Sequence, residues 1–129
     1  MKYMLMMNAT AKDWSGFGAM APQDIQAHIG FMRQLNKELG ASGELVDAQG
    51  LTGPEQAQVV RARGGEAPAV TDGPFSEAKE FLAGYWVLDC RSHERVIEIA
   101  ARISAAPGRG GAPLNIPVEL RPIGAPPQV

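Results

Sequence analysis

Hydrophobic residues follow two rhythms along this chain, the alternating runs typical of strands and the three-to-four-residue repeats typical of helices. Residues 2–8 form a continuous apolar run of Met, Leu and Tyr, and residues 81–89 are apolar on both alternating sets. A strand of that composition is covered on both faces. Both segments are therefore predicted to be central strands of a sheet.

Two other segments repeat their apolar residues at helical spacing. Residues 22–39 begin with Pro22, which suits the first turn of a helix, and the glycines that follow suit its end. Their apolar stripe consists of Ile25, Ile29, Met32, Leu35 and Leu39. Residues 92–103 begin with Ser92, a favourable N-cap, and carry a second apolar stripe. Both segments are predicted to be amphipathic helices with one face on the core.

The remaining apolar pattern predicts shorter strands and one long loop. Strands are expected at residues 44–51, 56–63 and 114–121, with only a short edge strand at 67–71 because of its proline. Residues 9–21 have few periodic apolar residues and predict a loop. This loop carries more apolar side chain than a solvated loop needs, in Trp14, Phe17 and Met20. We therefore expect it to fold over the core edge or the mouth of a pocket.

The order of these elements predicts an α+β fold, the βαββαβ split pattern of ferredoxin-like domains with an extra small hairpin in the middle. Residues 1–123 are expected to form this single domain, followed by a tail at 124–129. Two helices cover only one face of such a sheet. The doubly apolar central strands would then leave an open apolar face, which predicts a homodimer that buries it.

Composition narrows the classes of function. The chain has 129 residues, a net charge of −2 and a pI of about 5.6, so it lacks the basic face of a protein that binds nucleic acid directly. A single cysteine, Cys90, excludes an internal disulfide framework, and with two histidines no metal site is expected. No cofactor motif is present, so none is expected.

The hydropathy pattern gives no sign of a membrane association. No apolar run approaches the roughly 18 residues that span a bilayer, and the apolar run at the start is too short for the core of a signal peptide. We expect a cytoplasmic protein.

A turn motif precedes the second central strand. Residues 70–80 read Val-Thr-Asp-Gly-Pro-Phe-Ser-Glu-Ala-Lys-Glu. Asp72-Gly73-Pro74 is typical of a tight turn, in which Asp bonds its own downstream backbone and Pro fixes φ. Asp72 is therefore either a structural turn residue or a carboxylate held on a stiff turn beside a reactive group.

His28 lies within the apolar stripe of the first predicted helix. It is either a core or rim histidine bonded to a backbone carbonyl, or a general base near the turn, since histidine titrates nearest neutral pH. In the second interpretation Asp72 orients one tautomer of His28 and stabilises the imidazolium. Nothing in the sequence identifies the neighbouring Thr71 or Ser76 as an activated nucleophile.

The ten residues from Thr71 to Glu80 closely resemble the signature of the DGPF-type members of the YCII-related family. The similarity extends to the Met/Tyr-rich opening strand, the helix carrying His28, and Gly84-Tyr85-Trp86. It covers the chain except the glycine-rich loop at 108–113 and the tail. Ser76 and Ala78 stand where Ala and Thr are commoner, which removes a threonine from the motif.

This resemblance implies a dimeric ferredoxin-like α+β barrel with His28 and Asp72 as the suggested active-site pair. It leaves the function open between two classes. One is a small-molecule enzyme or binding domain, in which His28 acts as general acid or base and Asp72 orients it. The other is a regulatory module with a transcription-related protein partner of the sigma-factor type. A fold that keeps the pocket without activity is a third possibility.

Overall fold

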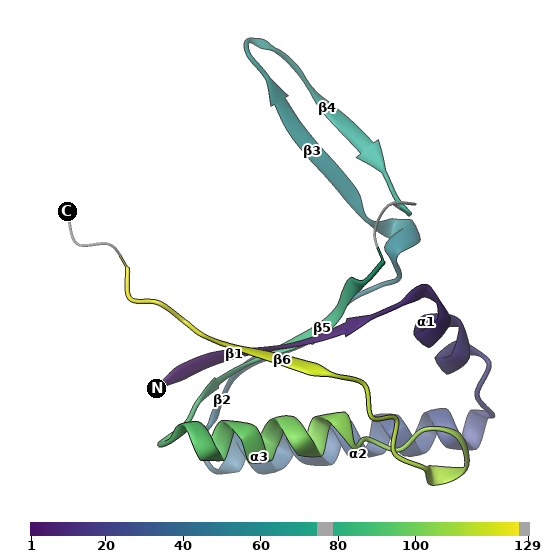
Figure 1. The fold of residues 1–129 in the computed structure, drawn as a ribbon, viewed down its shortest axis with the longest axis vertical. Helices are drawn as coiled ribbons and strands as arrows, with labels where there is room; N and C mark the ends of the chain where they lie inside the picture. Colours follow the sequence, from purple (N-terminus) through teal and green to yellow (C-terminus); the bar gives the residue numbers. More distant parts are fainter. Residues whose placement is uncertain (75–78, 127–129) are drawn as a thin grey trace.

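The computed structural model describes residues 1–74 and 79–126, so the part of the turn motif from Phe75 to Ala78 lies outside the described residues. The elements in chain order are β1 (Lys2–Ala9), α1 (Ala11–Gly18), α2 (Pro22–Ala41), β2 (Leu45–Gly50), η1 (Pro54–Gln56), β3 (Gln58–Arg63), β4 (Glu66–Asp72), β5 (Phe81–Asp89), α3 (His93–Ser104), η2 (Arg109–Gly111) and β6 (Val118–Pro122). Figure 1 shows α2 and α3 side by side under one sheet, and a two-stranded arm above it.

The main sheet is antiparallel, with strand order β2-β5-β1-β6. The long apolar strands β1 and β5 occupy its two central positions, as their composition predicts. With α2 between β1 and β2, and α3 between β5 and β6, the connectivity is the βαββαβ ferredoxin-like pattern. The predicted fold class is therefore confirmed for the single chain, including an extra hairpin between the two halves.

The core fills the space between this sheet and the helices α2 and α3. Leu5 and Trp86 stand opposite each other on β1 and β5 and point to the helices. Fully buried side chains from all three layers meet there: Leu5, Leu35, Leu39, Leu88, Val96, Ile99 and Ile103. Each such side chain contributes roughly 1.5–3 kcal/mol by leaving water. Over the described ranges, no helix is both long and apolar enough to cross a membrane.

Within residues 1–74 and 79–126, no layer of helices or strands covers the opposite face of the sheet. Met4 pairs with Val87 and Met6 with Tyr85 across β1 and β5, and these four side chains alternate with the core residues. They are only partly buried. We call these four residues the open face.

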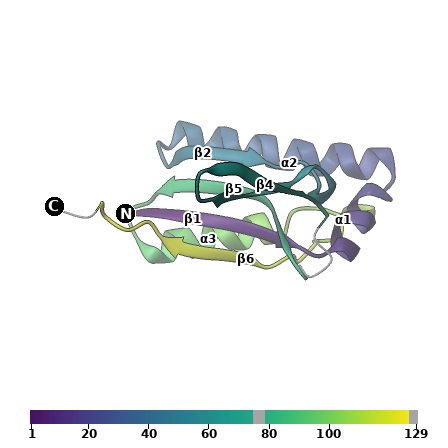
Figure 2. The same cartoon turned by 90° about the horizontal axis from the view of Figure 1, so that it is seen from above.

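β3 and β4 form the arm, a hairpin that pairs only with itself. It projects from the side of the open face, away from α2 and α3 (Figures 1 and 2). All its strand residues except Ala69 are exposed, with Val60 64% and Val70 53% accessible. β4 covers residues 66–72, so it is longer than the short edge strand expected at 67–71.

The prediction of a loop over residues 9–21 is wrong, because α1 occupies most of it. Thr10 and Asp13 form a capping box: the Thr10 hydroxyl accepts from the Asp13 N–H, and the Asp13 carboxylate accepts from the Thr10 N–H. This reciprocal pair satisfies donors that a helix start leaves open. The apolar pattern did not predict this short helix, because α1 has no buried residues that would form an apolar stripe.

The last strand is also shorter than predicted, since β6 begins at Val118 rather than near Leu114. Asn115 has a positive φ of 55°, and Pro117 has no N–H to donate to a ladder. The backbone here bonds to the end of α3 instead, from Leu114 N to Ala106 O and from Asn115 N to Ser104 O. The alternation of apolar residues in this segment therefore does not reflect a strand before Val118.

One ion pair ties α3 to the start of β2. Arg95 donates from Nε and Nη2 to the two carboxylate oxygens of Glu44, both at 2.9 Å. The Ser42 hydroxyl donates to the same carboxylate at 2.7 Å. Bonding to Arg95 is the main reason that the pKa of Glu44 falls to about 2. The pair therefore joins the two halves of the fold through a partly buried bidentate contact.

Replacing Arg95 by Met should lower the free energy of unfolding at pH 7 by about 2 kcal/mol, because the aliphatic stem remains but Glu44 loses its cation. The pKa of Glu44 is depressed in the fold, from 4.5 to about 2. Its contribution is thus complete above about pH 4.5 and is lost as the pH falls toward 2. Urea unfolding at a series of pH values should show wild type and variant converging over this range.

Arg102→Met provides the matched control. Arg102 bonds Glu38 at 2.7 Å, but both side chains are at least 40% exposed. Its loss should cost much less than that of Arg95. Equal losses for the two variants at every pH would contradict the role given to Glu44 and Arg95.

Candidate functional site

Two glycines open a hollow between the sheet and α2. Gly50 on β2 lies directly opposite Gly84 on β5, and both stand on the side of the sheet that faces the helices, in register with Ala48 and Trp86. Without side chains at this pair the sheet cannot fill the gap beneath α2. The result is a hollow of about 230 Å³, which we call the inner hollow.

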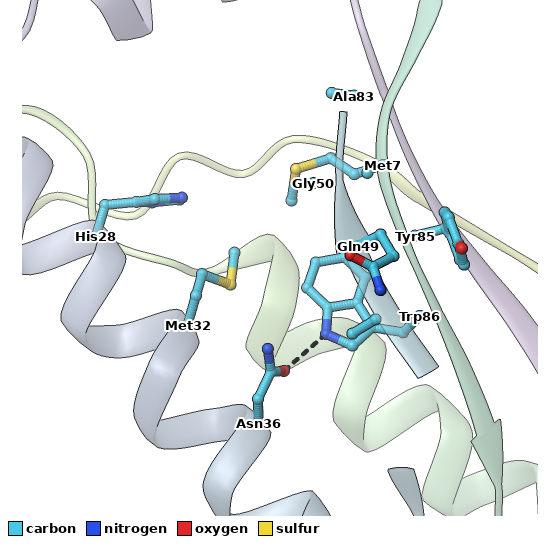
Figure 3. Close-up of a pocket in the computed structure, with 11 residues that line it drawn as sticks. Met7, His28, Met32, Asn36, Gln49, Gly50, Ala83, Tyr85 and Trp86 are labelled. Atoms are coloured by element: carbon cyan, nitrogen blue, oxygen red, sulfur yellow. Dashed lines mark hydrogen bonds between the residues drawn. The ribbon is translucent and has the colours of Figure 1, made fainter. Parts of the chain in front are cut away.

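Three residues of α2 form the wall opposite these glycines. His28, Met32 and Asn36 follow one another at intervals of four residues, so they lie along one face of the helix. Figure 3 shows all three directed to the cavity, with Met7 of β1 and the Trp86 indole across from them. The inner hollow is therefore mainly apolar, with an imidazole and an amide set along one wall.

A second hollow of about 250 Å³, the outer hollow, adjoins the first and shares part of its lining. Its own walls come from α1 and from the segment before β6, namely Trp14, Phe17, Leu114 and Ile116. Both hollows are lined by Met7, His28, Gly50 and Ala83. His28 thus stands at their junction. Trp14 and Phe17, expected at either the core edge or the mouth of a pocket, line this outer hollow.

The ring of His28 is held by the loop that follows α3. Its Nδ1 lies 3.1 Å from the carbonyl oxygen of Pro107. A carbonyl can only accept, so Nδ1 carries the proton and the neutral ring leaves a lone pair on Nε2. Phe17 packs edge-on against the imidazole, with ring centroids 4.9 Å apart. Backbone and aromatic contacts thus fix both the tautomer and the orientation of the ring.

Burial lowers the pKa of His28, because the half-buried ring is costly to charge, and the Pro107 carbonyl opposes this only in part. The imidazole is therefore neutral at pH 7 and its Nε2 can accept a proton. The sequence left two alternatives for His28, a rim histidine bonded to a backbone carbonyl or a general base. The bond to Pro107 agrees with the first alternative, and Nε2, which bonds no other described residue, remains available for the second.

Asn36 is oriented by Trp86 in a comparable way. The indole Nε1 donates to Asn36 Oδ1 at 3.0 Å (Figure 3). Because an indole nitrogen can only donate, the amide oxygen is turned to Trp86 and the Nδ2 group to the other side. Among the described residues, Asn36 Nδ2 has no hydrogen-bond acceptor. The site thus offers a fixed donor in addition to the fixed acceptor of His28.

Asp72 lies elsewhere, at the base of the arm. Its Oδ1 accepts from Gln58 Nε2 at 2.8 Å, and the residue is exposed. Asp72 lines neither hollow beside His28, and the hydrogen bonds of the described residues do not join the two. Pro74 of the same turn lines a separate hollow at the arm base. A joint role for His28 and Asp72 stays a prediction, and Ser76 lies outside the described residues.

Several residues of the site were not predicted from the sequence. Asn36 follows His28 and Met32 at helical spacing, so its place on the same helix face could have been predicted from the sequence. Glycines inside the two strands also indicated a close approach or a gap, as Gly50 and Gly84 show. Nothing in the sequence indicated that the loop after α3 would hold His28. As for metals, residues 1–74 and 79–126 contain no cluster of three or more His, Cys, Asp or Glu side chains.

Comparison with known proteins gives the family. The chain matches the family model of the YCII-related domain over residues 1–112. The chain belongs to the YCII-related family. An uncharacterised protein of Rhizobium meliloti (strain 1021) is 33% identical to this YCII-related chain over 82 residues, which span 64% of the chain and 61% of that relative. The family resemblance read from the sequence is confirmed, while Leu114 and Ile116 lie beyond the matched range.

For this YCII-related protein, two-dimensional proton–nitrogen NMR of the imidazoles should show His28 as the Nδ1–H tautomer with a pKa below 6.5, since burial disfavours the charged ring. Asp72→Asn should leave this titration unchanged, because Asp72 bonds Gln58. A pKa of His28 that falls in Asp72→Asn would instead support the predicted pair. An Nε2–H tautomer would contradict the bond to Pro107.

Proposed function

We propose that the protein binds a small molecule in the two adjoining hollows, and that His28 acts on it as a general base. The observation that carries this proposal is the position of His28 at the junction of the hollows, with Nδ1 bonded to Pro107 and Nε2 open. A neutral imidazole with a free lone pair can accept a proton from a bound molecule. The protonated ring can return that proton in a later step, as a general acid.

The lining supports acid–base chemistry more than covalent catalysis. Among the described residues of both hollows there is no Ser, Thr, Cys or Lys that could attack a substrate. The apolar walls also favour binding, because ligand sites are mostly apolar with a few well-placed polar groups. A proton transfer at Nε2 is therefore the reaction type that these residues support best.

A panel of neutral and charged single-ring compounds tests this proposal. Binding is followed by NMR of the methionine methyl groups, since Met7 and Met32 line the cavity and Met4 and Met6 lie on the open face. Compounds that bind should shift the first pair only. His28→Ala should weaken them about tenfold or more by removing one hydrogen bond and ring contacts, if the bound group carries a proton.

His93→Ala is the matched control, because this second histidine lies on α3 and bonds Tyr3 outside the cavity. It should leave binding unchanged. Binding should also weaken as the pH falls through the pKa of His28, since the imidazolium has no lone pair. Compounds that shift only Met4 and Met6, or a His28→Ala variant that merely loses its fold, would reject the proposed role.

We further propose that two copies pair through the open face. Met4, Met6, Tyr85 and Val87 form an apolar centre, and the arm rises beside it on the same side (Figure 1). A second copy seated there would remove this centre from water, and the arm would flank it. A face-to-face pair of sheets is also what the family resemblance implies.

Val87→Glu tests this pairing, since it puts a charge in the middle of the open face without touching the core. Light scattering after size-exclusion chromatography should give a dimer for the wild type and a monomer for the variant. Circular dichroism should show the same fold for both. A monomeric wild type at micromolar concentration would refute the proposed pairing.

The family subtype, the cellular location and the class of protein partner are inferred from the sequence alone. We infer the DGPF type within the family from the ten residues Thr71 to Glu80. A cytoplasmic location and a transcription-related partner stay predictions of the sequence.

A further inference from the structure

We propose that the ligand of this site is a small uncharged molecule built on one six-membered ring, with a hydrogen-bond donor at one end and an acceptor at the opposite end. The inference deepens the proposed function and rests on it, because it names the ligand of the same cavity. Three features of the inner hollow carry it: its lack of charge, the fixed directions of its two polar groups, and its size.

The described residues that line the inner hollow include no Asp, Glu, Lys or Arg. Gln49 and Tyr85 contribute uncharged groups to its wall, and the Nε2 group of Gln49 and the hydroxyl of Tyr85 donate to Asp47 on the other side of the sheet. An ionised ligand group would therefore lose its hydration without gaining a partner of opposite charge, which is strongly unfavourable. The hollow selects against carboxylates, phosphates and amines alike.

The two polar side chains that α2 presents to the hollow have complementary and fixed roles. Nε2 of His28 accepts, because Pro107 holds the proton on Nδ1, and Nδ2 of Asn36 donates, because Trp86 occupies its oxygen. A ligand that satisfies both must donate at the His28 end and accept at the Asn36 end. The reverse arrangement would leave two donors or two acceptors facing each other.

The helix sets the distance between these groups. His28 and Asn36 are eight residues apart on α2, which places their Cα atoms about 12 Å apart at the usual rise per residue. Both side chains reach into the inner hollow from this one helix. A ligand that bonds both must therefore extend along the helix axis, with its donor and its acceptor at opposite ends.

The volume of the inner hollow and the residues of its walls suit a six-membered ring. Cavities of about 150 Å³ already hold benzene, and the inner hollow has about 230 Å³. Between the two polar groups lie the thioether of Met32 and the Trp86 indole, both of which make favourable contacts with an aromatic face. The outer hollow leaves room for a substituent beyond His28.

Three matched probes test the inference on the protein with its unmodified sequence. Para-hydroxybenzyl alcohol has the proposed charge and spacing, para-hydroxybenzoate adds a charge, and meta-hydroxybenzyl alcohol shortens the spacing. Methionine methyl NMR at pH 7 should show the para alcohol shifting Met7 and Met32, with an affinity about tenfold or more above that of the benzoate. The meta isomer should bind several-fold more weakly because it loses one bond.

Asn36→Asp is the decisive variant, because its carboxylate still accepts from Trp86 but can no longer donate to the ligand. It should weaken the para alcohol about tenfold or more. Gln26→Glu places the same new charge on an exposed position of α2 and should leave the affinity unchanged. Equal affinity of wild type and Asn36→Asp overturns the inference.

The three probes test the proposed ligand class even if Asn36→Asp does not fold. A benzoate that binds as tightly as the para alcohol, or no shift with any probe at millimolar concentration, overturns the inference. Other compounds that bind beside Met7 and Met32 and depend on His28 would then leave the proposed function standing. Absence of any compound at this cavity would reject both.

Discussion

The structure depends on the one-sided packing of α2 and α3 against a four-stranded sheet. Leu5, Trp86 and Leu88 anchor this contact from the sheet, and the buried leucines and isoleucines of the helices complete it. Because both helices lie on one face, no helix in the described part of the chain covers the partly buried apolar side chains of the other face. Because the sheet carries two facing glycines, Gly50 and Gly84, the same contact leaves a gap near His28. The site and the open face are thus two results of one packing arrangement.

Within that gap, the polar groups owe their directions to partners with a single hydrogen-bonding capacity. The carbonyl of Pro107 only accepts and the indole N–H of Trp86 only donates, so neither His28 nor Asn36 can reverse its role without losing a bond. Such an arrangement needs no charged residue to orient the imidazole. It differs from the carboxylate–histidine pair that the sequence suggested, in which Asp72 would perform this task.

Much of the fold could be predicted from the sequence, because β1, α2, β5 and α3 have strong apolar periods that match their burial. The short helix α1 and the true start of β6 could not be, because local capping and a positive φ at Asn115 decided them. His28 could be identified as a candidate from its place on the apolar stripe. Its partner could not, since Pro107 lies 79 residues further along the chain and contributes only a backbone carbonyl.

The two glycines of the hollow differ in how much room each leaves for a side chain. A β-carbon at Gly84 would lie 3.1 Å from the carbonyl oxygen of Gln49, so the close pairing of β2 and β5 restricts this position. A β-carbon at Gly50 would meet no atom within 4 Å. Position 50 can therefore vary in side-chain size while the backbone stays in place. A single substitution at position 50 would therefore reshape the hollow beside His28 on an unchanged scaffold.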